Sequence, residues 1–186
     1  TVAASFTVSA PVAERGDSPY RRWRRRLKRL ERSRRLPGDE DLQLRDVDIV
    51  VFGLGRMGSR AYDAVHAYLP GRILGVDLDP AVVARSASKG RTAVVGDATD
   101  PEYWSRAEGL IDKLQWVLLT MSAHEANVAA VNRLRDRGFK GRIAATSSYP
   151  DEAQELRSLG VEFAFDVFAE AGAGFASDLA DRLQNT

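Results

Sequence analysis

Beyond position 48, short β-branched runs alternate with longer stretches in which apolar residues recur at helical spacing. Short apolar runs bounded by glycine and polar residues are typical of buried strands, and apolar residues three and four apart are typical of amphipathic helices. This pattern predicts six strands, at residues 49–52, 73–76, 93–95, 116–119, 143–145 and 162–165. It predicts helices at residues 58–68, 81–88, 124–137, 151–159 and 168–183.

A helix follows almost every predicted strand, and the connections are short, which is the sequence form of successive βαβ units. A closed barrel of this kind needs about eight units, so the pattern favours an open sheet. We predict an α/β fold, a Rossmann-type doubly wound parallel sheet of six strands, over residues 48–186.

Residues 1–47 have a different composition and form a separate predicted region. An apolar lead-in ends near Ala13 and falls short of the ~20 residues that a membrane-spanning helix requires. It lacks the basic n-region of a signal peptide. A basic stretch follows, and Pro37 and Gly38 then mark a linker. Because the chain begins at Thr1 rather than at methionine, we expect a fragment of a longer protein or a processed product.

Although the formal net charge of the chain is only +1, one stretch of it is strongly basic. From Arg21 to Arg35 there are ten basic residues and one acidic residue, a local charge of +9, and the remaining 17 basic and 25 acidic residues leave −8. Contact with anionic lipid would contribute about 1 kcal/mol per basic residue near a membrane surface. A solvated linker is the alternative. Nucleic-acid binding is disfavoured, because the stretch has one tryptophan and no companion motif.

The scarcity of cysteine and histidine excludes several kinds of site. The chain has no cysteine, which removes disulfides, thiolate metal sites and cysteine nucleophiles and suits a reducing compartment. Only His66 and His124 can supply an imidazole. Histidine-rich metal centres and Ser-His-Asp hydrolases are therefore disfavoured.

A glycine-rich loop carries the strongest functional signal. Gly53, Gly55 and Gly58 form a G-x-G-x-x-G pattern between a predicted strand and a predicted helix. In such loops the first glycine permits a tight turn, the second allows close approach of a pyrophosphate, and the third packs the helix on the strand. The amides that begin the helix then point toward the phosphates.

An acidic residue at the end of the next strand strengthens the prediction that the glycine-rich loop binds a nucleotide. Asp77 lies 19 positions after Gly58, where a carboxylate accepts hydrogen bonds from ribose hydroxyls. A carboxylate there repels a 2′-phosphate, which favours NAD or an adenosine nucleotide over NADP. Asp79, directly before Pro80, is the better predicted N-cap for the following helix and leaves Asp77 for a ligand.

Four motifs stand at strand ends: the G-x-G-R-x-G loop, the D-L-D-P run, the G-D-A-T-D-P run, and the T-M-S run with an asparagine after it, at residues 53–58, 77–80, 96–101, 120–122 and 127. Together they resemble the N-terminal lobe of the RCK domain, also called the TrkA-N domain. Residues 168–176, and the basic stretch with its apolar lead-in, look most like the tails of Kef-type monovalent cation:proton antiporters. The resemblance implies a nucleotide site that binds NAD(H) or AMP, with neither a catalytic residue nor a metal. The residues that it places around the nucleotide are Gly53, Gly55, Arg56, Met57, Gly58, Asp77, Leu78, Asp97, Ala98, Thr120 and Ser122.

Two of these positions have alternative interpretations. Thr120 ends the fourth predicted strand, so it either faces the ligand or caps the following helix. His124 and Glu125 begin that helix and are either a catalytic pair or, more often in such positions, solvated side chains.

The resemblance implies a cytoplasmic regulatory domain, attached to an upstream membrane transporter domain and paired with a second copy through the Rossmann lobe. In it, nucleotide binding would bias a potassium or other cation antiporter between states. Because the chain stops at Thr186, before a second RCK lobe, regulation is expected to work through this lobe. The alternative is the cofactor domain of an NAD-dependent dehydrogenase, which usually requires a substrate domain and a proton-transfer residue.

Overall fold

The computed structural model describes residues 47–184, which fall within one compact unit, Gln43–Thr186. The predicted apolar lead-in, the basic stretch with its proposed lipid contact, and most of the linker region lie outside the described residues.

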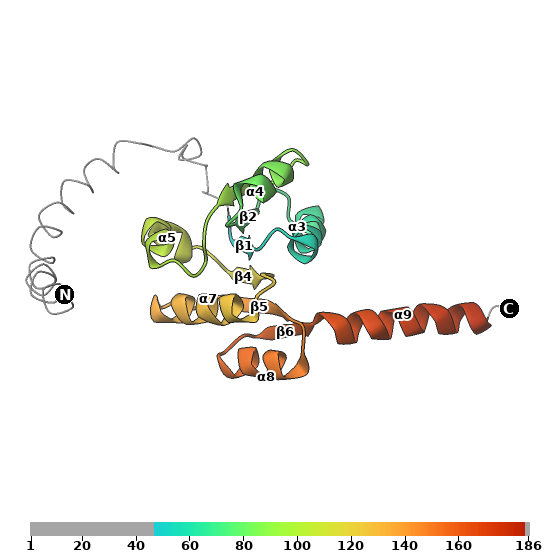
Figure 1. Cartoon of the computed structure of the whole chain (residues 1–186). Helices are drawn as coiled ribbons and strands as arrows, with labels where there is room; N and C mark the ends of the chain where they lie inside the picture. The colour runs from blue at the N-terminus through green and yellow to red at the C-terminus, as the bar shows by residue number, and fades with distance from the viewer. Residues whose placement is uncertain (1–46, 185–186) are drawn as a thin grey trace, which may run out of the picture. The chain divides into compact units, whose positions relative to one another are not determined.

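The described residues form a single sheet of six strands that all run parallel (Figure 1). Its order is β3-β2-β1-β4-β5-β6, so the direction of winding reverses between β1 and β4. The strands are β1 (Ile49–Phe52), β2 (Ile73–Asp77), β3 (Ala93–Val95), β4 (Trp116–Leu119), β5 (Arg142–Ser147) and β6 (Phe163–Asp166). The predicted Rossmann-type doubly wound α/β fold is confirmed, and ligands of such sheets bind at the carboxyl edge near the reversal.

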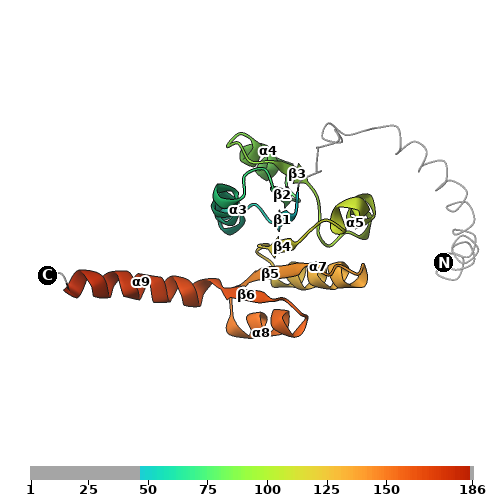
Figure 2. The same cartoon turned by 180° about the vertical axis from the view of Figure 1, so that it is seen from behind.

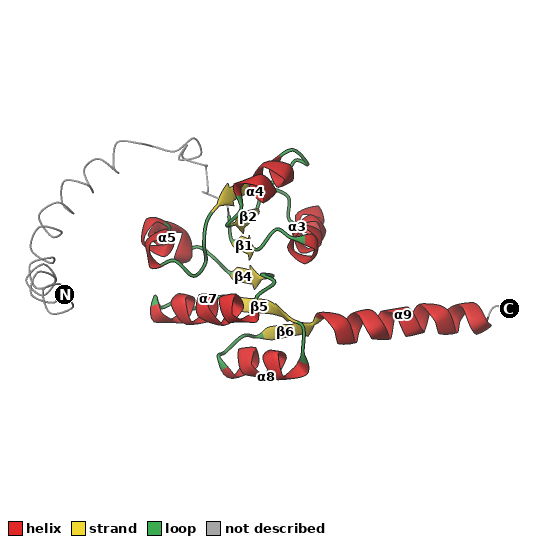
Figure 3. Cartoon of the chain, in the orientation of Figure 1, coloured by secondary structure: helices red, strands yellow, loops and turns green. Residues whose placement is uncertain are grey.

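Helices connect the strands on both faces of the sheet (Figures 2 and 3). Helices α3 and α4 lie before and after β2, α5 and α6 join β3 to β4, α7 and α8 follow in turn, and α9 comes after β6. Their bounds are α3 (Arg56–Tyr68), α4 (Pro80–Ala87), α5 (Pro101–Arg106), α6 (Glu108–Ile111), α7 (His124–Asp136), α8 (Pro150–Ser158) and α9 (Val167–Gln184). All the predicted helices are present within one or two residues of their predicted bounds.

The sequence pattern missed α5 and α6. Helix α5 begins with the same Asp-Pro signal that predicts α4: Asp100 is its N-cap and accepts a hydrogen bond from the amide of Glu102 at 2.8 Å. The helix is only six residues long, too short to show a helical repeat of apolar positions. The cap alone was therefore the available signal.

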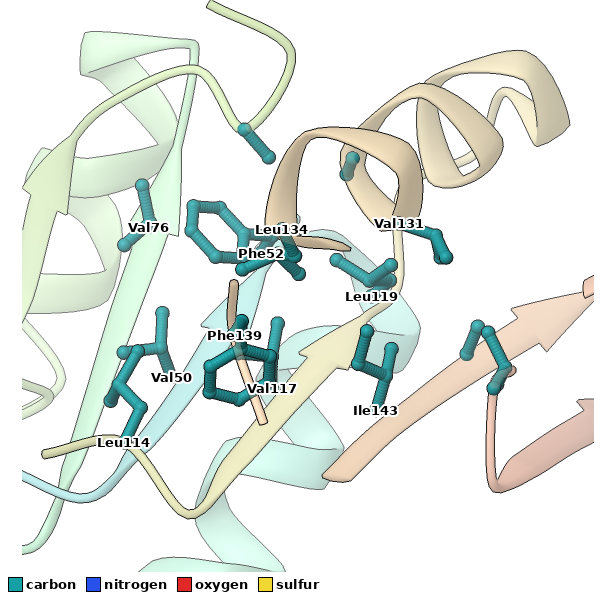
Figure 4. Packing of buried hydrophobic residues seen from close by; sticks show 14 of the residues in the cluster. Val50, Phe52, Val76, Leu114, Val117, Leu119, Val131, Leu134, Phe139 and Ile143 are labelled. Carbon is teal, nitrogen blue, oxygen red and sulfur yellow. The ribbon is translucent and has the colours of Figure 1, made fainter. Parts of the chain in front are cut away.

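The main hydrophobic core lies on one face of the sheet, beneath α5 to α8 (Figure 4). Val50 and Val117 from the central strands are fully buried there, as are Trp104 of α5 and Leu134 of α7. A smaller core lies on the opposite face, where Tyr62 of α3 packs over β1 and β2. Strands β1 and β2 are buried on both faces, which explains why their apolar runs are continuous rather than alternating.

The face opposite the main core is left partly open along β4, β5 and β6. Side chains alternate along each strand, so residues between the core positions point to this second face. We call this surface the β4–β6 outer face. None of its apolar side chains is buried: Trp116, Leu118, Ala144, Phe163 and Phe165.

Helix α9 extends from the end of β6, and none of its residues is buried. Figures 1 and 2 show it running away from the other helices of the sheet. Four large apolar side chains share one side of the helix, because they are 7, 4 and 4 positions apart. We call them the α9 stripe, and they are exposed: Phe168 by 68%, Phe175 by 74%, Leu179 by 48% and Leu183 by 70%.

Candidate nucleotide site at the carboxyl edge of the sheet

The glycine-rich loop turns the chain from β1 into α3 at the centre of the sheet. Gly53 adopts a φ of +88°, which side chains rarely allow, and a Cβ there would lie 2.9 Å from the backbone of Thr120 and Met121. Glycine at this position is therefore required both by the turn and by the closeness of β4. The predicted role of the first glycine is confirmed.

The other two glycines differ from each other in their surroundings. A Cβ on Gly58 would lie 1.7 Å from the carbonyl oxygen of Gly53, so helix α3 touches the loop directly at this point. A Cβ on Gly55 would meet nothing within 4 Å. The third glycine thus serves packing, whereas the second keeps the space beside the backbone open.

Helix α3 begins with its first-turn amides unoccupied by a side-chain cap. Gly55 is the N-cap residue, and the first turn contains no acidic side chain. Four amides at the start of any helix lack partners within the helix, and they carry a partial positive charge. Arg56 is exposed at the first position, and Met57 beside it is half-buried. This end of α3 is suited to an anion such as a phosphate.

Asp77 ends β2 and lies against the loop. Its Oδ2 accepts a hydrogen bond from the amide of Leu54 at 2.7 Å, and its Oδ1 accepts one from the amide of Asp79 at 2.9 Å. Each carboxylate oxygen keeps a further lone pair for another donor. The half-buried carboxylate is thereby held at the loop, at the distance and orientation set by two backbone amides.

Asp79, two residues after Asp77, has the capping role that the sequence predicts. Asp79 is the N-cap of α4 and accepts from the amide of Ala81 at 2.8 Å, with Pro80 at the first helical position. Leu78 between them is 68% exposed. An exposed leucine at the carboxyl edge is available to pack against a flat apolar group.

The G-D-A-T run after β3 forms a tight polar turn. Oδ1 of Asp97 accepts from both the amide and the hydroxyl of Thr99, at 2.7 Å each. Ala98 is buried, and its carbonyl oxygen accepts from Nε1 of Trp104 at 2.7 Å. The run is therefore built into the fold, and Ala98 presents no exposed side chain to a ligand.

The turn at residues 96–99 packs against an aromatic cluster. The ring of Tyr103 lies edge-on to Phe52 and to Trp104, with centroids 5.9 and 5.2 Å apart. A Cβ on Gly96 would lie 2.4 Å from the Tyr103 ring, so glycine is needed for this packing. Burial raises the pKa of the Tyr103 hydroxyl to about 12, because the phenolate would lose its hydration. Tyr103 thus stays neutral at physiological pH.

Thr120 ties the loop to the end of β4. Its Oγ1 lies 2.9 Å from the carbonyl oxygen of Phe52 and 2.6 Å from that of Gly53. The N-cap interpretation of Thr120 is wrong, because the N-cap of α7 is Ala123, which has no capping side chain. The hydroxyl contacts the backbone at the end of the neighbouring strand, four residues before the helix begins.

Two polar residues beyond Thr120, Ser122 and His124, differ in their surroundings. Ser122 is exposed at the edge of the sheet. His124 does not pair with Glu125: its Nε2 lies 2.8 Å from Oε2 of Glu155 in α8. The histidine therefore links two helices, and the structure gives no support to a catalytic His-Glu pair within α7.

Amide and hydroxyl side chains form hydrogen bonds at this edge that the sequence pattern did not predict. Nδ2 of Asn127 donates to the carbonyl oxygens of Met121 and Thr146, at 3.1 and 3.3 Å. The hydroxyl of Thr146 donates to Leu119, and that of Ser147 to Phe165. The available signal was a pair of polar residues directly after the strand predicted at 143–145, and an asparagine inside the helix predicted at 124–137, since buried polar groups require such partners.

Two properties of residues 47–184 bear on the class of protein. No helix in this range is both long and apolar enough to cross a membrane. Within the same residues, no three acidic or histidine side chains are grouped as metal ligands.

The glycine loop, the uncapped start of α3 and the acid at the end of β2 define a Rossmann-type nucleotide-binding fold. Residues 49–166 match the family model of the TrkA-N domain, and the chain belongs to this family. Among curated proteins, none matches the sequence significantly.

Three solved structures show the same fold at low sequence identity. The NAD(P)-binding domain of an exopolyphosphatase-related protein from Archaeoglobus fulgidus is 20% identical, with a TM-score of 0.63 over 73% of this chain and 98% of that one. The Kef C-terminal domain of Shewanella denitrificans, in AMP-bound form, is 16% identical, with a TM-score of 0.60 over 73% of this chain and 80% of that one. The GsuK RCK domain is 23% identical, with a TM-score of 0.60 over 75% of this chain and 29% of that one.

Proposed function

We propose that this domain binds NAD(H) or AMP at the carboxyl edge of the sheet and acts as the cytoplasmic regulatory domain of a potassium or other monovalent cation:proton antiporter. The proposal places the domain at the cytoplasmic face of the membrane, joined to a transporter domain, with a sensing rather than a catalytic role. The structural neighbour in AMP-bound form is a Kef C-terminal domain, which supports both the ligand class and the setting.

The observation that carries the proposal is the pairing of an open loop with a held carboxylate. The space beside Gly55 is free for a phosphate, and the amides of α3 are uncapped. Asp77 is fixed beside the same loop by the amide of Leu54, at a position where a ribose hydroxyl donates to it. The phosphate and ribose of one adenosine nucleotide therefore have adjacent partners.

The same carboxylate supports a preference against NADP. A 2′-phosphate would lie beside the negative charge of Asp77, and the two amides that contact Asp77 already hold that charge in place. We expect NADPH and 2′-AMP to bind more weakly than NADH and 5′-AMP.

Two apolar surfaces support the proposed homodimer. The α9 stripe is exposed, and the β4–β6 outer face is partly exposed, with Trp116 and Leu118 packed at one side against the smaller core beneath α3. Exposed apolar side chains that lie together are typical of interfaces. In a two-fold pair, each α9 would cover the outer face of the other copy, which makes the contact self-complementary.

Calorimetry on the full 186-residue chain tests the proposed function. Titrations with AMP, NADH, NAD, ATP and NADPH should show binding tighter than millimolar for at least AMP or NADH, and weaker binding of NADPH. An assay of NADH consumption with common hydroxy acids and aldehydes should show no turnover. If neither AMP nor NADH binds below millimolar, the sensing role is wrong; NADH consumption would instead favour a dehydrogenase.

A further inference from the structure

One peptide group of the glycine loop is held at both ends by side chains from other strands. The carbonyl oxygen of Gly53 lies 2.6 Å from the hydroxyl of Thr120, at the end of β4. The amide of the next residue, Leu54, donates to Asp77 at the end of β2, at 2.7 Å. Thr120 and Asp77 are thus joined through the Gly53–Leu54 peptide.

The hydroxyl group of Thr120 donates its hydrogen bond to the carbonyl oxygen of Gly53. A threonine hydroxyl has a single proton, and Oγ1 has two carbonyl oxygens within reach. The carbonyl oxygen of Phe52, the more distant of the two, already accepts the backbone amide of Thr120 at 2.8 Å. The carbonyl oxygen of Gly53, at the shorter distance, therefore accepts the hydrogen bond.

This hydrogen bond bears directly on Asp77. A donor at the carbonyl end of a peptide strengthens its N–H as a donor, because hydrogen bonds in a chain polarise one another. It also fixes the plane of the peptide, and hence the direction in which the Leu54 amide points. Without it, the loop loses one restraint on the amide that holds the carboxylate.

We propose that Thr120 is a positioning residue of the nucleotide site: it acts through the Gly53–Leu54 peptide to hold Asp77 in place, and it does not contact the nucleotide itself. The inference rests on the proposed function, and it differs from the resemblance, which places Thr120 around the nucleotide. Thr120 then determines affinity through a group on another strand.

A comparison of Thr120→Ala with Thr120→Ser separates the hydroxyl from the methyl group. Alanine is preferred to valine, because a methyl in place of Oγ1 would lie 2.6 Å from the Gly53 oxygen, where carbon–oxygen contacts are about 3.3 Å or longer. We expect Thr120→Ala to weaken AMP binding about tenfold, because the amide that holds Asp77 loses one of its restraints. Thr120→Ser should stay within about threefold of the natural chain, by the same reasoning.

Thr146→Ala is the matched control. Its hydroxyl also donates to a neighbouring strand at the same edge of the sheet, to Leu119 at 3.4 Å, but it does not touch the loop. AMP affinity should be unchanged in this variant. An equal loss of affinity in Thr146→Ala would mean that removing any hydroxyl at this edge weakens AMP binding by making the edge less rigid. That result would overturn the inference.

A double-mutant cycle with Asp77→Ala distinguishes positioning from contact. If Thr120 acts through Asp77, adding Thr120→Ala to Asp77→Ala should weaken AMP binding less than about twofold further, since coupled sites are not additive. Additive losses would show a direct contact of Thr120 with the nucleotide and overturn the inference. Hydrogen exchange at the Leu54 amide should also become faster in Thr120→Ala, without any nucleotide present.

The two proposals fail in distinguishable ways. If the natural chain binds neither AMP nor NADH, the proposed function is wrong and the inference falls with it. If the natural chain binds AMP and Thr120→Ala binds it equally well, only the inference is wrong. Should Thr120→Ala not fold in buffer, the natural chain and the variant are compared in sucrose, which stabilises compact states; a loss of AMP affinity of about tenfold is expected there as well, and equal affinity of the two chains would overturn the inference.

Discussion

The carbonyl oxygen of Gly53 occupies the place where a side chain on Gly58 would begin, 1.7 Å from the ideal Cβ position. We expect Gly58→Ala to lower the free energy of unfolding by about 3 kcal/mol or more, because the clash is with backbone and requires the loop to move away from α3. Urea denaturation of the variant and the natural chain measures the difference. A change below about 1 kcal/mol would show that helix and loop separate readily.

Gly55→Ala is the counterpart, since a Cβ there meets nothing within 4 Å. Its backbone is extended, with a φ of −64°, so alanine should change stability by no more than about 1 kcal/mol. AMP binding should nevertheless weaken at least about tenfold, which is about 1.4 kcal/mol, because the new methyl group occupies the space proposed for a phosphate. Undiminished AMP affinity would place the phosphate elsewhere.

Asp77→Ala should weaken AMP and NADH binding at least about tenfold, by removing a charged hydrogen-bond acceptor for the ribose. It should also reduce the discrimination against NADPH, since the repelling charge is gone. Calorimetry with the three nucleotides measures both effects. Asp79→Ala is the control: it removes the N-cap of α4, so it should cost about 1 kcal/mol of stability while leaving AMP affinity unchanged.

Phe175→Glu should convert the proposed homodimer to a monomer, because it puts a charge in the middle of the α9 stripe. Sedimentation velocity at several protein concentrations measures the change. Ser177→Glu introduces the same charge two positions along, on the opposite side of α9, and should leave the dimer intact. A natural chain that sediments as a monomer would contradict the homodimer without affecting the nucleotide site.

The pair of Asp63 and Arg91 should contribute stability that depends on pH. Two contacts of 2.6 Å join the guanidinium to the carboxylate, and this hydrogen bonding lowers the pKa of Asp63 below its usual 3.8. A lowered folded-state pKa stabilises the fold above the unfolded pKa, and the contribution is lost as the pH falls through the folded value. Asp63→Asn should thus be less stable than the natural chain at pH 7, by under about 1 kcal/mol because the carboxylate is half exposed.

The difference should disappear as the pH falls through the lowered folded-state pKa of Asp63, where the carboxyl group of the natural chain becomes protonated. Thermal unfolding of both chains across this range measures it. Arg91→Ala should show the same dependence, because it removes the other half of the pair. A stability difference that persisted in strong acid would mean that Asp63 acts through packing rather than charge.

Much of the candidate site was predictable because its signals are local. The turn at Gly53, the N-cap at Asp79 and the strand end at Asp77 each depend on a few neighbouring residues, and all three predictions are confirmed. The interpretation of Thr120 as an N-cap was wrong, although it too used a local signal. The helix begins four residues later, at His124, and the threonine side chain had a nearer partner on another strand.

The sequence by itself determined the class of fold, the position of the glycine loop and the acid beside it, because periodicity and turn chemistry act over short stretches of chain. Only the tertiary structure decided what those residues touch. Parallel strands bring their carboxyl ends together regardless of their separation in sequence, so Thr120 meets the carbonyl oxygen of a glycine 67 positions earlier, and Asp77 meets the amide beside it. The sequence names the residues of this edge, whereas the order of the strands decides which of them form pairs.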